Sequence, residues 1–501
     1  MVGRLSVCRW RIGVRTRDKE QKLSTEIEDK LSKETDEVTD RSLVVEDFWY
    51  PAELELLGLP PTGSQAGDLI FLSAQSGMDF ASGRLRNNIW ELEDRVPNGI
   101  VTGLEHRDGR EGPVQAQAFQ AYWNIAAILE TRGTSLGSIV RQRIYLANHR
   151  DGPAVEKVIV AMFGDDLPAT NFSDVGGAGP IGDELIWIDV VATVDDPASL
   201  KKIHLQRYRG ATGSYPAAVV TEGLAFTSGI RGVSPNTGRL AEGPEDVPDD
   251  VANVIFGGPP WTSMSEVRLK AQMGCAFDAM KELLGSLDVD SSRLITTNYM
   301  TRAGMNEWGA AVISPRRFLY EDRPRPATTA LAVLGLDSME SEVSVDGVIA
   351  LKTTEVNRYA GAEIAMSIVD MAASGGPYVF TTGYVGMDKG LHRAIAGPED
   401  LEEGPGRLLN ADCASARGAI RAQAWHVYIW IRRMLTEIGS SGDRVVQQTI
   451  YVRDRHDVPE ILSFCRQAFM GRLPPTTVVG VEDIGPYPGL LFEVDVIAVR
   501  T

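Results

Sequence analysis

Cysteine and histidine are scarce in this chain, and their placement argues against several kinds of site. Four cysteines occur in 501 residues, and none forms a C-x-x-C motif. A zinc site and a disulfide framework are therefore not expected, and a reducing compartment fits. The six histidines form no H-x-x-x-H or H-E-x-x-H pair, so we expect no metal site. We also expect no cofactor, in agreement with the absence of a P-loop sequence.

Positive charge is outnumbered as well. The chain has 50 lysines and arginines against 68 aspartates and glutamates, a formal net charge of −18. This excess of acid argues against nucleic acid or an anionic membrane as a partner. No apolar run reaches the roughly 20 residues that a membrane-spanning helix needs. We expect a cytoplasmic protein with a small-molecule substrate, and further self-association is left open.

Residues 1–43 stand apart from the rest of the chain. Residues 1–17 contain several arginines and no acid, and the following stretch is highly charged with few apolar residues. We expect a charged N-terminal extension that is disordered. An organelle-targeting presequence, which is also rich in arginine and poor in acid, is the alternative.

Three segments of the chain repeat one another. Each contains a strand-like end with a phenylalanine, a helix-like stretch that opens at a glutamine, a Pro-x-Thr segment and a closing strand with one aspartate. The markers are Phe71, Phe226 and Phe380; Gln117, Gln272 and Gln423; Pro168, Pro326 and Pro474; and Asp189, Asp346 and Asp495. They recur at intervals of about 150 residues, a domain-sized period. We predict domains at residues 44–203, 204–356 and 357–501.

Each repeat has the predicted element order ββ–α–β–α–ββ. Helical spacing of apolar residues predicts long helices at about 114–131, 266–287 and 413–438. β-branched residues predict middle strands at about 138–147, 293–301 and 445–452. This order implies an α+β domain with both helices on one face of a mixed sheet. Three such sheets facing one another would form an intramolecular pseudo-trimer with a closed central β-barrel and outer helices.

The order and spacing of these markers resemble the RidA/YjgF family of enamine/imine deaminases, whose fold is similar to that of the small trimeric chorismate mutases. The resemblance covers about residues 44–500, three times over. It implies sites between neighbouring subunits of a trimer. It also implies an arginine just after a Pro-Ala pair that binds the substrate carboxylate, and an acid on the last strand that places the attacking water.

The arginine position of the family is occupied by threonine in every repeat, at Thr170, Thr328 and Thr476. Threonine cannot bind a carboxylate through two parallel hydrogen bonds, as a guanidinium does. Either the substrate is bound in another way or another cation takes the role. Arg325 and Arg472 are candidates because they lie just before the Pro-x-Thr segments. Surface arginines at the entry of a strand are the alternative.

The acid position is filled each time, and the resemblance makes Asp189, Asp346 and Asp495 the candidate catalytic residues. The alternative is that these acids satisfy neighbouring backbone groups or a lysine or arginine that joins two domains. Tyr215 matches the tyrosine at the mouth of the family's site, and Gln75 matches the glutamine of its first turn. Both could equally be turn and barrel residues. Because the three interfaces differ, we expect one or two of them to be competent.

Three functions remain open. The first is a cofactor-independent hydrolase or deaminase that acts on a small imine, enamine or related polar metabolite at an inter-domain site. The second is a non-catalytic small-molecule-binding or scaffold protein, favoured by the missing arginine. The third is chorismate-type or ring-opening hydrolysis on the same scaffold. Fold alone does not decide among them.

Overall fold

The computed structural model describes residues 43–501 apart from residues 90, 93–95, 97–110, 177–182, 259–265, 322–323, 339, 361–369, 389, 391 and 402–417. Residues 43–500 form one compact unit. The expectation for the N-terminal extension lies almost wholly outside the described residues. The three predicted domain limits stay predictions.

The predicted element order recurs along the chain. The first repeat contains β1 (Val45–Phe48), β2 (Gly63–Ala66), β3 (Leu69–Ser76), α2 (Glu111–Thr131), β6 (Ile139–Leu146), α3 (Gly152–Phe163), β7 (Ala169–Asp174) and β8 (Ile186–Thr193). The second contains β9 (Lys201–Ile203), β10 (Ala218–Val220), β11 (Leu224–Thr227), β12 (Ile230–Arg231), α4 (Asp249–Phe256), α6 (Val267–Ser286), β13 (Leu294–Thr301), α7 (Met305–Tyr320), β14 (Ala327–Ala332) and β15 (Val343–Ala350). The third contains β16 (Val356–Tyr359), β17 (Ala372–Gly375), β18 (Tyr378–Thr381), β19 (Tyr384–Val385), α9 (Gly418–Glu437), β22 (Val445–Val452), α10 (Val458–Ala468), β23 (Thr476–Gly480), β24 (Asp483–Ile484) and β25 (Phe492–Val499). Two short hairpins, β4 (Met78–Asp79) with β5 (Arg84–Leu85) and β20 (Met387–Asp388) with β21 (Arg393–Ala394), complete the strands.

The three sheets share one strand order. It is β1-β2-β3-β8-β6-β7 in the first, β9-β10-β11-β15-β13-β14 in the second and β16-β17-β18-β25-β22-β23 in the third. The strand of the Pro-x-Thr segment runs parallel to the middle strand, whereas the closing strand runs antiparallel to it. Each sheet is therefore mixed, as the α+β prediction requires.

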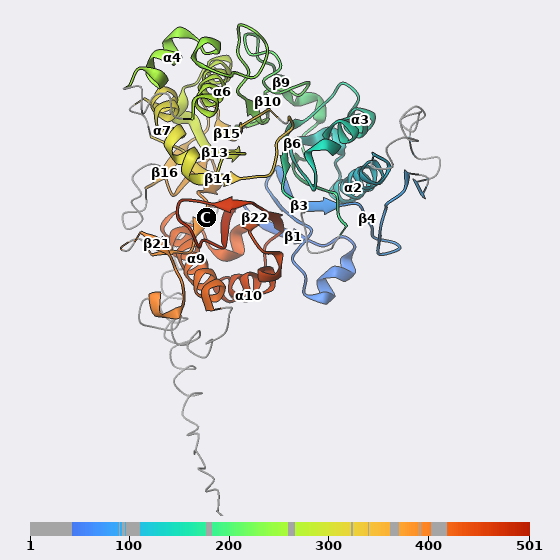
Figure 1. The fold of residues 1–501 in the computed structure, drawn as a ribbon. Helices are drawn as coiled ribbons and strands as arrows, with labels where there is room; N and C mark the ends of the chain where they lie inside the picture. Colours follow the sequence, from blue (N-terminus) through green and yellow to red (C-terminus); the bar gives the residue numbers. More distant parts are fainter. Residues whose placement is uncertain are drawn as a thin grey trace, which may run out of the picture. The chain divides into compact units, whose positions relative to one another are not determined.

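Each sheet has two apolar faces. One face packs against the helices of its own repeat, for example α9 and α10, which lie side by side in Figure 1. The residues of the other face meet those of the other two sheets in one shared core, which includes Phe71, Phe226 and Phe380. The repeated phenylalanine of the sequence is thus a core residue at the place where the three sheets meet.

The closed central barrel expected from the sequence is a wrong prediction. The longer strands of the described residues fall into three separate sheets, and the two short hairpins form two-stranded sheets of their own. Among these described strands, ladder bonds between repeats are confined to the short β14–β24 pairing and one bridge between Asp174 and Gly335. The reason lies at the edge of each Pro-x-Thr strand. There the Thr170 amide donates to the Ser228 hydroxyl of the next repeat at 2.8 Å, and the Thr328 amide donates to Thr382 at 2.8 Å. One backbone bond accompanies each of them, from the Gly229 amide to the Thr170 carbonyl at 3.0 Å and from the Gly383 amide to the Thr328 carbonyl at 3.3 Å. These mixed contacts do not extend into a continuous ladder.

Candidate functional site

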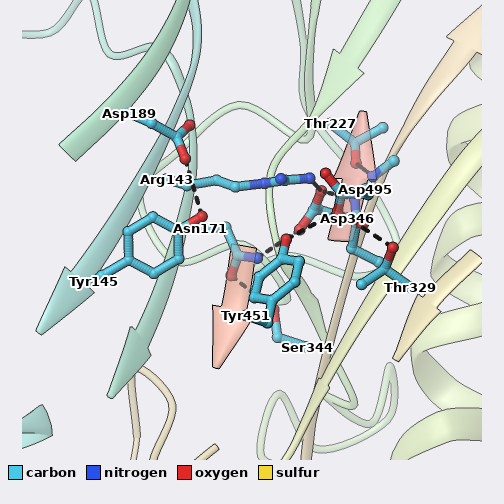
Figure 2. A network of polar contacts seen from close by, with 12 residues as sticks. Arg143, Tyr145, Asn171, Asp189, Thr227, Thr329, Ser344, Asp346, Tyr451 and Asp495 are labelled. Carbon is cyan, nitrogen blue, oxygen red and sulfur yellow. Dashed lines mark hydrogen bonds and ion pairs between the residues drawn. The ribbon is translucent and has the colours of Figure 1, made fainter. Parts of the chain in front are cut away.

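A polar layer crosses the contact between the three sheets. Alternate residues of a strand share a face, so Trp187, Asp189 and Val191 of β8 point the same way. Trp187 and Val191 belong to two separate apolar clusters, and Asp189 lies between them. Asp346 of β15 and Asp495 of β25 occupy the matching places in the other sheets. The three repeated aspartates therefore belong to one interior layer (Figure 2).

Asp346 is fully buried and fully engaged. Its carboxylate accepts hydrogen bonds from Arg143 at 2.9 Å, Asn171 at 2.6 Å and Asn298 at 3.0 Å. Arg143 and Asn171 come from the first repeat, so this ion pair joins two repeats. Such an arrangement fits the domain-joining interpretation of the acid, because breaking a buried ion pair leaves an uncompensated charge.

Asp189 and Asp495 are held differently. The Tyr145 hydroxyl donates to Asp189 at 2.9 Å, and the other Asp189 oxygen is buried with no partner among the described residues. Tyr451 and Thr329 donate to Asp495 at 3.1 and 3.3 Å. Burial raises the pKa of both carboxyls above the usual value for aspartate. Figure 2 shows Arg143 reaching across the layer toward Asp346.

A cavity of about 430 Å³ lies between the second and third repeats. Its walls come from α7 and β14 of the second repeat and from the β18–β19 turn, α9 and β25 of the third. The lining residues are Met305, Trp308, Gly309, Val312, Ile313, Arg316, Arg325, Thr328, Ala330, Met371, Thr382, Gly383, Tyr384, Val385, Met387, His426, Trp430, Gly485, Pro486 and Glu493. The cavity thus combines apolar and aromatic walls with a small set of charged groups, as ligand sites commonly do.

Glu493 is the carboxylate of this cavity. It lies on the closing strand β25, two residues before Asp495, so both side chains are on one face of the strand. Burial raises the pKa of Glu493 well above its usual value, and the neighbouring charge of Asp495 raises it further. A carboxyl with a raised pKa in a cavity is a candidate for acid–base chemistry.

Arg316 is the buried cation of the same cavity. Its guanidinium lies over the rings of Trp308, at 5.0 Å, and Tyr299, at 5.4 Å. Stacking on two aromatic rings fixes the plane of the guanidinium before a ligand arrives. Among the ion pairs of the described residues, none joins Arg316 to Glu493, although both line the cavity.

Equivalent positions in the other interfaces carry no such pair. Glu493 stands two residues before the repeated aspartate, where the second repeat has Ser344 and the first has Trp187. Arg316 lies one helical turn before the Tyr320 ring that packs on α6. The corresponding residues before Phe163 and Phe469, which pack on α2 and α9, are Ile159 and Cys465.

The first interface, between the first and second repeats, is filled by rings. Phe172 stands two residues after Thr170, where the cavity has Ala330 after Thr328. The Phe172 ring packs against Tyr215 with centroids 6.0 Å apart. Tyr215 therefore lies at this interface, where the resemblance placed it, but among buried core side chains.

The other predicted site residues are engaged within the fold. Arg472 forms a two-pronged ion pair with Asp47 at 2.6 and 2.7 Å and does not line the cavity. Gln75 donates to the carbonyl of Ser73 at 2.9 Å. Arg325 does line the cavity.

The three threonines lie at the contacts between repeats. Thr170 accepts from Gln142 at 3.0 Å and Thr476 accepts from Gln448 at 2.8 Å, while Thr328 is a lining residue of the cavity. Their hydroxyls also donate to the carbonyls of Pro168, Pro326 and Pro474. They act as strand-end residues in all three repeats.

Sequence reasoning missed Glu493 and Arg316 because it followed the residues that recur. A signal was present in the sequence: each is a charged residue at a position where the other repeats have an uncharged one. Within the described residues no group of three or more His, Cys, Asp or Glu side chains is placed to hold a metal ion. Among those residues no helix is long and apolar enough to cross a membrane.

Two segments of the chain, residues 101–194 and 406–500, match the family model described as Endoribonuclease L-PSP. A curated relative from Dermatophagoides farinae, named 2-iminobutanoate/2-iminopropanoate deaminase, is 28% identical over 105 residues. That match spans 21% of this chain and 63% of the relative. The resemblance to the RidA/YjgF family is thereby confirmed, with the matched segments in the first and third repeats.

Solved structures are also similar. RidA from the Antarctic bacterium Psychrobacter sp. PAMC 21119 is 25% identical, with a TM-score of 0.20. The match spans 27% of this chain and 87% of the RidA chain. A chorismatase is 13% identical, with a TM-score of 0.43, and the match spans 72% of this chain and 93% of the chorismatase chain.

Proposed function

We propose that the cavity between the second and third repeats is the active site of a cofactor-independent deaminase that hydrolyses an imine. The observation that carries the proposal is the presence of Glu493 and Arg316 in one cavity, at positions where the other two interfaces have uncharged residues. The name of the Dermatophagoides farinae relative favours a 2-imino acid as substrate. In this proposal the three repeats act as an intramolecular pseudo-trimer with one competent interface.

The chemistry requires one water and no redox partner. Arg316 binds the substrate carboxylate, since a guanidinium donates two parallel hydrogen bonds to it. The Glu493 carboxylate takes a proton from water as the water oxygen attacks the imine carbon. The same carboxyl then returns that proton to nitrogen, which gives a carbinolamine. The Glu493 carboxylate next takes the hydroxyl proton of the carbinolamine and passes it to the nitrogen, so the C=O bond forms as the C–N bond breaks and ammonia leaves. One imine and one water become one carbonyl compound and one ammonia.

The raised pKa of Glu493 supports this role. Burial and the neighbouring Asp495 raise the pKa of Glu493, so its carboxyl holds a proton more tightly than an exposed glutamate does and is better able to pass one to nitrogen. Asp189, Asp346 and Asp495 remain the alternative water-positioning acids. The full set of partners around Asp346 favours a structural role for that residue.

The test is ammonia release from 2-iminopropanoate, formed in situ through 2-aminoacrylate, and from 2-aminomuconate. Wild type is compared with Glu493→Gln and with the Asp→Asn variants at 189, 346 and 495. We expect release by wild type, its loss in Glu493→Gln, and its retention in those aspartate variants that remain folded. Loss in a folded Asp189→Asn or Asp495→Asn variant, with Glu493→Gln fully active, would move the catalytic role back to the central layer.

A non-catalytic binding protein is the second candidate, and one observation favours it. All three threonine positions lack the family's arginine, so the usual carboxylate clamp is missing. Ligand binding in the cavity without ammonia release from any imine would support this function over the first.

A further inference from the structure

We infer that the cavity selects a substrate with a large, apolar and preferably aromatic side chain, an imine of the 2-imino-3-arylpropanoate class. This inference rests on the proposed function for its chemistry. Its structural basis is separate, because it depends on the walls of the cavity and not on Glu493.

The size of the cavity is the first argument. At about 430 Å³ it falls in the range of roughly 300–1,000 Å³ typical of sites for drug-sized ligands. A three-carbon imino acid held by Arg316 and Glu493 would leave most of this space filled with water against apolar walls. A larger apolar group would displace that water, which is favourable.

The chemistry of the walls is the second argument. On the α7 side lie Met305, Trp308 and Val312, and on the facing side lie Met371, Met387 and Trp430. Methionine sulfur and indole rings make favourable contacts with an aromatic ring.

The first interface contains an aromatic ring at the place where the cavity is open. There Phe172 stands where the cavity has Ala330, and its ring is packed on Tyr215. A protein side chain with a phenyl ring therefore occupies the equivalent space in the first interface. In the cavity, the small side chain of Ala330 leaves the same space open. This space suits the phenyl group of a ligand.

Steady-state kinetics test the inference directly. 2-Imino-3-phenylpropanoate and 2-iminopropanoate are generated in situ from D-phenylalanine and D-alanine by D-amino-acid oxidase, and the acceleration of ammonia release is measured for each. We expect kcat/KM for the phenyl substrate to exceed that for 2-iminopropanoate by at least about tenfold, because even one additional methylene in an apolar pocket changes kcat/KM by about that factor. Equal values for the two substrates would overturn the inference and leave the proposed function intact.

Ala330→Phe is the decisive variant, because it places in the cavity the ring that fills the first interface. We expect it to abolish the preference for the phenyl substrate, so that the ratio of kcat/KM for 2-imino-3-phenylpropanoate to kcat/KM for 2-iminopropanoate falls to about one or below. Leu334→Phe, at an exposed position just beyond β14, is the matched control and should leave the preference unchanged. An unaltered preference in a folded Ala330→Phe protein would contradict the inference.

Product binding separates the two proposals and needs no variant. Phenylpyruvate and pyruvate are titrated into the wild-type protein while the fluorescence of its tryptophans is followed, since Trp308 and Trp430 line the cavity. We expect phenylpyruvate to bind at least about tenfold more tightly. Tight phenylpyruvate binding without ammonia release from either imine would disprove the deaminase and support the ligand class. No difference between the two ketoacids would overturn the ligand class.

Discussion

The first interface and the interface that holds the cavity are formed by sheets of the same strand order. They differ in what lies between the sheets. Both are bordered by a Pro-x-Thr strand whose threonine amide donates to a hydroxyl of the next repeat at 2.8 Å. One is filled by Phe172 and Tyr215, and the other is open and carries Glu493 and Arg316.

The difference shows how a repeated chain can separate stability from chemistry. A homotrimer must use one residue at each position for all of its interfaces. Here the first interface has Ser344, whose hydroxyl donates to Asn171 at 3.2 Å, and Ile159, which packs in the apolar core. Glu493 and Arg316 occupy the equivalent positions of the cavity. A buried charge costs stability unless it is paired, and an uncharged residue at the equivalent position avoids that cost.

The largest expected effect is the loss of Glu493. Glu493→Gln removes the proton acceptor and donor of the cavity, so imine-dependent ammonia release should fall by about 10²–10⁴-fold. Ser344→Ala, the same position in the second repeat, should leave the rate unchanged. Comparable losses in both variants would show that the two interfaces do not differ in function.

Next in size is the effect of emptying the first interface. Phe172→Ala removes a buried ring that packs on Tyr215, and should lower the free energy of unfolding by about 3–5 kcal/mol. Ammonia release per folded molecule should not change, because Ser344 stands where a carboxylate is needed. Chemical denaturation monitored by circular dichroism gives the first quantity. New activity in this variant would contradict the assignment of chemistry to Glu493.

A smaller effect is expected at Arg316. Arg316→Gln should raise KM for imino acids by about 10–100-fold with a smaller change in kcat, since hydrogen bonds to a charged group contribute about 1.5–3 kcal/mol. Arg317→Gln, the exposed neighbour on α7, is the control for loss of one positive charge. A KM that stays at the wild-type value would remove Arg316 from substrate binding.

The smallest expected effect is the dependence of stability on pH. The raised pKa of Glu493 means that the folded protein holds this proton more tightly than the unfolded chain does. Its contribution therefore makes the folded state less stable as pH rises from about 4.5 through the folded pKa. Glu493→Gln should remove this decline, and so gain stability relative to wild type at pH 8 but not at pH 4. Parallel curves of unfolding free energy against pH for the two proteins would mean that Glu493 has an ordinary pKa.

Much of the fold follows from local patterns. The predicted middle strand at 445–452 coincides with β22, and Gly439 ends α9 with a positive φ of 73°, as a C-cap glycine does. Asp457 directly precedes α10, but its side chain makes no capping bond there. Asp454 caps the preceding turn instead, by accepting from the His456 amide at 2.9 Å. A turn of 3₁₀ helix before α10 moves the cap by one turn, which spacing alone does not show.

The site was harder to predict than the fold. Repetition identifies what all three repeats need, and Asp189, Asp346 and Asp495 are of that kind because they share a layer inside the molecule. Glu493 is two residues from Asp495 and points the same way, yet only the meeting of β25 with α7 of another repeat places it in a cavity. Contacts between segments so distant in sequence are not contained in local periodicity.

Gly383 has a consequence for how such a site could be gained or lost. A methyl group at residue 383 would overlap the Glu493 carboxylate, so the acid and the glycine must be inherited together. The first interface already has Gly229 at the matching turn, where the Ser344 hydroxyl and the Asn171 side-chain oxygen lie over it. An acid at residue 344 would need no change of the glycine, but it would share this space with Asn171. The first repeat has Ala74 at that turn and Trp187 on the strand, so introducing an acid there would require two replacements, one at each residue. The other two interfaces are thus unequal starting points for acquiring a carboxylate at this position.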